Sequence, residues 1–263
     1  MTIVRVERVP MPVQQQQSAP GAWQVLAGVD APLRCWWTPA GGSVDGRSSR
    51  SDQAVLVLPE VFGVNGWVRS VAEWFAAAGV AALAMPLFAR TAPDLELGYD
   101  AAALAEGRRH KERTTTEGIL ADVEVAAAWL ETQGCSRLTV VGFCFGGHAA
   151  LLAATLPQVT ASFDFYGAGV ANARPGGGPP SLALLPRVQG QLTCICGTAD
   201  PLIPERDQQQ IAAALREADP TGQRLRYEAM EGADHGFMCE ARSNYHPACT
   251  ARGWQLLLES LRA

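Results

Sequence analysis

The chain of 263 residues is long enough for one large domain or two small ones, and its 48% of hydrophobic and 18% of charged residues exclude a wholly disordered protein. A net charge of −5 argues against nucleic acid as a partner, because phosphate binding requires a basic surface. Seven cysteines at irregular spacings predict free thiols in a reducing compartment rather than a disulfide framework.

The N-terminal residues lack the features of a targeting or membrane segment. Arg5, Glu7 and Arg8 interrupt the first apolar residues, which a secretory signal would keep continuous. No stretch reaches the ~18 apolar residues that a membrane span needs. We therefore expect a cytoplasmic protein with no membrane partner.

The expected elements alternate regularly along most of the chain. Two short edge strands are expected over 3–13 and 32–42, separated by a loop rich in Gln, Ser and Pro. From residue 53 onward, short apolar runs alternate with runs of helical period. The expected strands are 53–63, 80–88, 137–143, 159–167, 191–198 and 223–231, and the expected helices are 65–79, 114–134, 146–156, 204–220 and 248–263. Such alternation predicts an α/β fold with a mostly parallel sheet and helices on both faces.

The chain carries few signals of internal division. The Gly/Pro-rich stretch 173–181 is expected to be a loop within the domain, because strands and helices continue after it in the same order. Thr114 and Glu117 form a Thr-x-x-Glu pattern that predicts the start of the second expected helix, 114–134. We expect a single domain over residues 1–263, with residues 1–24 as a peripheral N-terminal segment.

A cysteine framed by glycines lies between an expected strand and an expected helix. The sequence Gly-Phe-Cys-Phe-Gly, residues 142–146, has the G-x-S-x-G pattern of a nucleophile elbow with Cys144 in place of serine. In such a turn the Phe145 N–H, at the start of the helix, is half of an oxyanion hole. A buried, inert cysteine is the structural alternative, and a phosphate-binding loop is disfavoured because the Walker lysine and G-x-G-x-x-G spacing are missing.

An acid and a histidine are expected after the nucleophile in that order. Asp200 follows one late strand and His235 follows the last, and His235 is the only one of the four histidines in a loop after a strand. Asp164, at the end of an earlier strand, is the rival acid. Asp234 is adjacent to His235 and is therefore badly placed to orient its ring.

Five stretches together resemble the dienelactone hydrolase family of α/β-hydrolases: LPEVFGVNGWVR, MPLFAR, GFCFGG, GTADPLIP and DHGF. The resemblance covers the chain from about residue 25 and implies an α/β-hydrolase fold. It also implies that Glu60 contacts the nucleophilic thiol, that the Val61 N–H completes the oxyanion hole, and that Arg90 binds a substrate carboxylate.

The chain departs from the family at one position. The family's second arginine lies four residues after the histidine, where this chain has Cys239. The nearest arginine is Arg242, which is the candidate to replace it in substrate binding.

These features predict a cysteine-nucleophile hydrolase of a small lactone or carboxylic ester, such as an anionic dienelactone, acting as a monomer or small homo-oligomer. No metal or cofactor is implied, because no cluster of residues has ligand spacing. Three alternatives stay open: a thiol-based redox sensor or regulator on a hydrolase scaffold, a binding scaffold with an inactive site, and a carboxylesterase for neutral esters.

Overall fold

The computed structural model describes residues 21–41 and 52–262. The expected strand over 3–13 lies outside the described residues. The strands are β1 (Ala22–Leu26), β2 (Leu33–Thr38), β3 (Gln53–Leu58), β4 (Ala81–Ala84), β5 (Arg137–Phe143), β6 (Val159–Phe165), β7 (Gln191–Gly197) and β8 (Leu225–Met230). The helices are α1 (Gly66–Ala77), α2 (Ala101–Lys111), α3 (Thr116–Thr132), α4 (Phe145–Ala153), α5 (Glu205–Ala218) and α6 (Pro247–Arg262), with a 3₁₀ helix, η1, over Ser181–Arg187.

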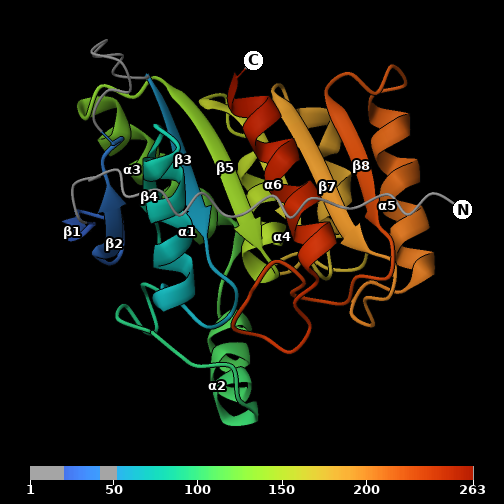
Figure 1. The fold of residues 1–263 in the computed structure, drawn as a ribbon, viewed down its shortest axis with the longest axis horizontal. Helices are drawn as coiled ribbons and strands as arrows, with labels where there is room; N and C mark the ends of the chain where they lie inside the picture. Colours follow the sequence, from blue (N-terminus) through green and yellow to red (C-terminus); the bar gives the residue numbers. More distant parts are fainter. Residues whose placement is uncertain (1–20, 42–51, 263) are drawn as a thin grey trace, which may run out of the picture.

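The eight strands form one sheet in the order β1-β2-β4-β3-β5-β6-β7-β8. The six strands from β3 to β8 pair in parallel, whereas β1 and β2 pair antiparallel at one edge. The prediction of a mostly parallel α/β sheet is confirmed. In Figure 1, α1 and α6 lie in front of the sheet and α3 and α4 lie behind it.

Two hydrophobic clusters pack against the sheet, since successive side chains of a strand point to opposite faces. Val55 and Val57 of β3 face α1 and α6, where the rings of Trp74 and Trp254 lie 4.4 Å apart. Leu56 of β3 belongs to the second cluster, which includes the buried faces of α3 and α4. Burial on both faces explains why the central strands are continuous apolar runs in the sequence.

Three local features differ from the expectations. Strand β1 begins at Ala22, inside the segment expected to be peripheral, and pairs with β2 at the edge of the sheet. Helix α2 was not predicted, because only Ala103 and Gly107 of its residues are buried and it has little apolar periodicity. Helix α3 begins at Thr116, two residues after the expected start, because Thr115 rather than Thr114 is its N-cap and the side chain of Thr115 accepts the Gly118 N–H.

The carboxyl ends of the parallel strands meet at one edge of the sheet, which is where open α/β sheets bind ligands. Helix α2 projects from this edge at the bottom of Figure 1. No helix in the described part of the chain is long and apolar enough to cross a bilayer.

Candidate active site

Cys144 lies in a strained turn between β5 and α4. Its backbone has φ +54° and ψ −115°, in the region that residues other than glycine rarely adopt. The Cys144 N–H donates to the Phe165 carbonyl oxygen at 3.0 Å, which fixes the turn against the end of β6. All seven cysteines are free and six are buried, while Cys144 is partly exposed.

The glycines on both sides of Cys144 are required by close backbone contacts. A Cβ atom on Gly142 would overlap the carbonyl oxygen of Gly146, and one on Gly146 would overlap the carbonyl oxygen of Leu58. The turn therefore requires the small residues that the G-x-C-x-G pattern provides. This geometry lifts the thiol of Cys144 out of the sheet at the start of α4.

Two loops beyond β7 and β8 bring Asp200 and His235 together. The Nδ1 atom of His235 lies 2.8 Å from Oδ2 of Asp200, and Oδ1 of Asp200 accepts the Leu202 N–H at 2.8 Å. Both side chains are buried. The carboxylate thus holds the ring with its Nε2 atom free of any hydrogen bond to the described residues.

The His235 ring lies within electrostatic range of Cys144. Burial lowers the pKa of the imidazole, but the charge of Cys144 and the contacts with Asp200 outweigh it and raise the pKa to about 10. The thiol does not complete a hydrogen bond to Nε2 in this structure. A raised histidine pKa favours an imidazolium beside the sulfur atom.

The two other acids considered from the sequence do not contact the ring of His235. Asp234 accepts the backbone N–H of His235 and the side-chain amide of Asn244. Asp164 is buried on β6, where burial raises the pKa of its carboxyl to about 7. Of the three acids, only Asp200 bonds to the imidazole.

Glu60 and Arg242 form an ion pair from opposite ends of the chain. Nη1 of Arg242 donates to Oε1 of Glu60 at 2.6 Å, and Oε2 of Glu60 is buried without a partner in the described chain. Burial raises the pKa of the Glu60 carboxyl, against the influence of Arg242 and His235. The structure shows no hydrogen bond between Glu60 and Cys144 among the described residues; the carboxylate faces the guanidinium instead.

The guanidinium of Arg242 lies within electrostatic range of the Cys144 thiol. Burial opposes its charge, but Glu60, Tyr166 and Cys144 together raise the pKa of the guanidinium. Gly236 allows this approach, because a Cβ atom there would overlap the guanidinium. Cys239, at the position of the family's second arginine, is fully buried, and burial raises the pKa of its thiol to about 11.

The two expected oxyanion donors lie at the ends of β3 and β5. Neither the Val61 N–H nor the Phe145 N–H donates a hydrogen bond to another described residue. Helix α2 packs against Val61 from outside, where a Cβ atom on Gly107 would overlap the Val61 carbonyl oxygen. The unpredicted helix therefore supports the loop that carries one of these donors.

Arg90 is not brought together with the other expected site residues. Its Nη1 and Nη2 atoms bond to both oxygens of Asp122 at 2.6 and 3.0 Å, and its Nε bonds to Asp30 at 3.0 Å. Asp122 is buried on α3. This placement does not support substrate binding by Arg90; it ties the loop after β4 to α3.

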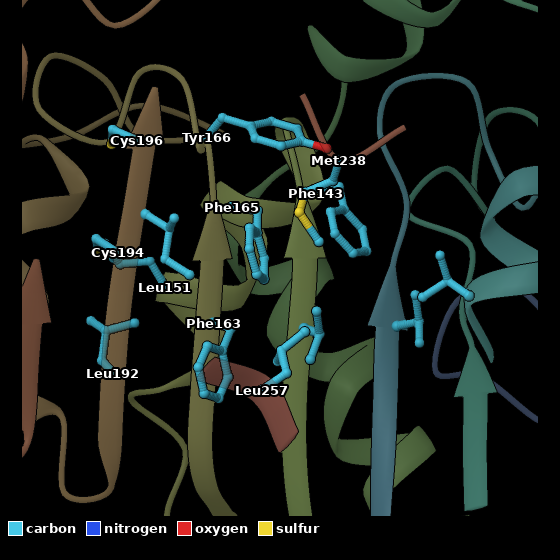
Figure 2. Close-up of a cluster of buried hydrophobic side chains, with 14 of the residues drawn as sticks. Phe143, Leu151, Phe163, Phe165, Tyr166, Leu192, Cys194, Cys196, Met238 and Leu257 are labelled. Atoms are coloured by element: carbon cyan, nitrogen blue, oxygen red, sulfur yellow. The ribbon is translucent and has the colours of Figure 1, made fainter. Parts of the chain in front are cut away.

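Tyr166 is a site residue that the sequence reasoning missed. Its backbone φ is +44°, its side chain is fully buried, and its hydroxyl has no partner among the described residues. The ring lies 5.2 Å from that of His235. Burial raises the pKa of the hydroxyl, and Glu60 raises it further, so the group stays a proton donor. Figure 2 shows Tyr166 just beyond the end of β6, with its hydroxyl directed away from Cys196 toward Met238.

In the described ranges, no group of three His, Cys, Asp or Glu side chains is placed to hold a metal ion. The groups gathered at the site are a thiol, an imidazole–carboxylate pair, two backbone donors, a buried ion pair and a tyrosine hydroxyl. Such a set can attack a carbonyl carbon and stabilise the oxyanion that forms.

Comparisons with known proteins agree with this arrangement. The family model described as "Dienelactone hydrolase family" matches residues 43–263. A Synechocystis protein named "Putative carboxymethylenebutenolidase" is 37% identical over 204 residues, covering 76% of this chain and 82% of that protein. The Pseudomonas putida protein named "Carboxymethylenebutenolidase" is 27% identical over 214 residues, covering 80% of this chain and 86% of that protein. A crystal structure from Klebsiella pneumoniae, described as a "Putative Dienelactone Hydrolase", has a TM-score of 0.79 at 23% identity, covering 92% of this chain and 98% of that one.

Proposed function

The chain belongs to the dienelactone hydrolase family, whose α/β-hydrolase fold and lactone- and ester-cleaving activity it shares, and on this premise we propose that it cleaves its substrate through Cys144. The observation that supports this most strongly is the strained turn at Cys144, beside a His235 ring that Asp200 orients. A buried structural cysteine would need neither the strain nor the oriented imidazole.

The proposed reaction starts from a Cys144 thiolate whose proton is held on Nε2 of the His235 imidazolium. The thiolate attacks the carbonyl carbon, and the Val61 and Phe145 N–H groups receive the oxyanion. The carbon–oxygen bond of the lactone or ester then breaks, and the leaving oxygen takes a proton from the His235 imidazolium. Water, deprotonated by His235, attacks the thioester and releases the acid and the free thiol.

The Tyr166 hydroxyl supplies a further donor in this proposal. It is buried, protonated and without a partner in the described chain, close to His235 and Cys144. A buried hydroxyl without a partner is unfavourable unless a ligand or water satisfies it. We assign it to a substrate oxygen, where it adds to the two backbone donors.

Arg242 is the proposed binding residue for a negatively charged group of the substrate. The relatives' name, carboxymethylenebutenolidase, denotes an unsaturated lactone that carries a carboxylate. Arg242 is the arginine beside the thiol, and it would hold such a carboxylate while remaining paired with Glu60. This role falls to Arg242 rather than Arg90, since all three donor nitrogens of Arg90 bond to Asp30 and Asp122.

A carboxylesterase for neutral esters is the second candidate. It is favoured by the pairing of both expected substrate-binding arginines, because Glu60 neutralises Arg242 and Asp122 neutralises Arg90. Values of kcat/KM for a carboxylated lactone and a neutral p-nitrophenyl ester of similar size separate the two functions. A preference for the neutral ester would favour the carboxylesterase.

The nucleophile is tested with Cys144→Ala, which we expect to lower kcat by at least about 10³-fold without unfolding the protein. Cys135→Ala, at a buried cysteine beyond α3, is the matched control and should retain most of the activity. Circular dichroism checks the fold of both variants. Substantial hydrolysis by Cys144→Ala would overturn the assignment.

Iodoacetamide separates the enzyme from a redox sensor with the same thiol. Labelling of Cys144 should be suppressed by a slowly turned-over lactone, which occupies the site as a thioester. A sensor that binds no lactone would be labelled at the same rate with and without it.

A further inference from the structure

A second cleft lies beside the catalytic turn and is lined by other residues. Its volume is about 560 Å³, within the range of small-molecule sites. The end of α2, the first turn of α4 and the loop after β6 form its walls, and its lining includes Phe145 but neither Cys144 nor His235. It shares with the proposed oxyanion hole only this phenylalanine.

Three cations line the cleft without an acidic partner in the described chain. Arg108 and Lys111 come from α2 and Arg174 from the loop after β6, and none of the three belongs to an ion pair there. Lys111 is the only lysine of the chain. The Nε of Arg174 is buried without a partner, and its Nη2 reaches only the Pro180 carbonyl oxygen at 3.3 Å.

Lys111 and Arg174 come from different segments of the chain, and both line the cleft together with the buried His148. Both act on His148 of α4, whose pKa is lowered to about 4. Burial lowers this pKa most, the hydrogen bond with the Ala168 carbonyl oxygen opposes the shift, and the charges of Lys111 and Arg174 lower it further. The imidazole is therefore neutral, and its ring nitrogens face the Ser181 hydroxyl at 2.7 Å and the Ala168 carbonyl oxygen at 3.2 Å. His148 therefore adds no charge of its own beside Lys111 and Arg174.

The wall that carries Arg174 is fixed to the start of α3. The Pro175 carbonyl oxygen accepts both the N–H and the hydroxyl of Thr116, at 2.9 and 2.8 Å. On the other wall, the Nζ of Lys111 lies 5.6 Å from the centre of the Phe145 ring. The cations thus face the cleft from anchored segments.

The lining of the cleft has an excess of positive charge, although the net charge of the protein is −5. Glu112 is the one acidic residue in the lining, against three cations. Lys offers a compact charge and Arg a planar fork of donors, and both bind carboxylate and phosphate oxygens.

We propose that this cleft is an anion-binding site, distinct from the Cys144 thiol, which takes the carboxylate or phosphate group of a small molecule between Lys111 and Arg174. Arg108, at the more exposed side, adds to the attraction. The proposal does not depend on hydrolysis, since binding here involves no covalent step.

Isothermal titration calorimetry of the full chain with inorganic phosphate and with succinate tests the site. We expect saturable binding of at least one anion, and no binding of dimethyl succinate, which has succinate's carbon skeleton without its charges. Lys111→Gln and Arg174→Gln should each weaken binding about three- to tenfold. Arg109→Gln is the matched control, because this arginine of α2 pairs with Glu106 and does not line the cleft.

The relative affinities distinguish the two anion sources, phosphate or carboxylate. Repeating the titrations on Cys144→Ala separates the site from the proposed chemistry, as binding should be unchanged there. Circular dichroism and urea unfolding establish that the glutamine variants are folded. Absence of saturable binding by both anions would overturn the proposal, as would equal weakening by Arg109→Gln.

Discussion

Cys144 is partly exposed, whereas the other six cysteines of the chain are buried. Burial raises the pKa of Cys135, Cys239 and Cys249, so these thiols stay protonated at neutral pH. A nucleophile needs a thiolate and access for its substrate. Only Cys144 combines partial exposure with a neighbouring imidazole. Cys144 is therefore distinguished from the other cysteines by the turn that holds it, since all seven have the same side chain.

The assignment of the acid predicts unequal effects of two conservative changes. Asp200→Asn should lower kcat by about 10²-fold or more, because the amide cannot hold His235 in the same tautomer or stabilise its imidazolium. Asp234→Asn should retain most of the activity, since Asp234 bonds only to the His235 backbone and Asn244. Steady-state kinetics on one ester measure both variants, and the reverse ranking would contradict the assignment.

Tyr166→Phe isolates the hydroxyl that has no partner in the described chain. We expect the free energy of unfolding to be unchanged or slightly raised, because the change removes a buried polar atom that bonds to no described residue. The value of kcat should fall about 10- to 100-fold if the hydroxyl bonds to an oxygen that becomes charged in the transition state. Urea unfolding and steady-state kinetics measure the two effects.

Tyr227→Phe provides the comparison, because the Tyr227 hydroxyl bonds to Gln208 at 3.0 Å and lies outside the site. It should lose stability and keep its activity. Unchanged kcat in Tyr166→Phe would show that the hydroxyl takes no part in the reaction.

The sequence predicts the candidate site only in part. Cys144, Asp200 and His235 could be found because each follows a strand, and a parallel sheet places the residues after its strands at one edge. Tyr166 could not be found in this way, since its positive φ and its isolated hydroxyl follow from tertiary packing. The position of Arg90 likewise depends on Asp122, which lies on another element.

Element prediction succeeded where burial produces a clear pattern. Strands β3 to β7 were expected from apolar runs, since their residues are largely covered by neighbouring elements. The edge strand β8 is buried only at its two ends. Helix α2 has its apolar residues in its first half rather than along one face, and it contacts the protein through Gly107, so its periodicity is weak. Its Asp100 N-cap and basic last turn were the signals available in the sequence. The missed helix holds two of the three cations of the second cleft.

At the scale of elements, Arg90 should contribute to stability and Arg242 to specificity. Arg90→Ala leaves the buried Asp122 carboxylate unpaired, which should lower the free energy of unfolding by about 2 kcal/mol, given that the Arg90 side chain is 30% exposed. Its relative kcat/KM for a carboxylated lactone and a neutral ester should not change. Urea unfolding and steady-state kinetics on both substrates measure this.

Arg242→Ala is the contrasting variant. It should reduce kcat/KM for the carboxylated lactone about tenfold more than for the neutral ester, since only the lactone has a carboxylate to lose. A shift of this preference in Arg90→Ala instead would return the substrate-binding role to Arg90.

For the molecule as a whole, buried ionisable groups couple folding to pH. Asp164 and Glu60 are both almost fully buried, and burial raises the pKa of each carboxyl. The pKa of His235 is also raised. A group with a raised pKa in the folded state binds its proton more tightly there than in the unfolded chain. All three groups therefore make folding more favourable at lower pH.

Asp164→Asn tests this coupling, because Asp164 lies outside the proposed chemistry. The folded pKa is about 7 against an ordinary value of 3.8. The contribution of Asp164 to stability is thus fully present below about pH 4 and is lost as the pH rises to about 7. Relative to the wild type, the Asn variant should gain stability across this interval, by on the order of 4 kcal/mol at most, and then level off. Asp94→Asn, at a carboxylate that is 72% exposed, should show a much smaller change with pH. Urea unfolding from pH 4 to 8 measures the difference, and a gain that is the same at every pH would show that Asp164 does not bind a proton on folding.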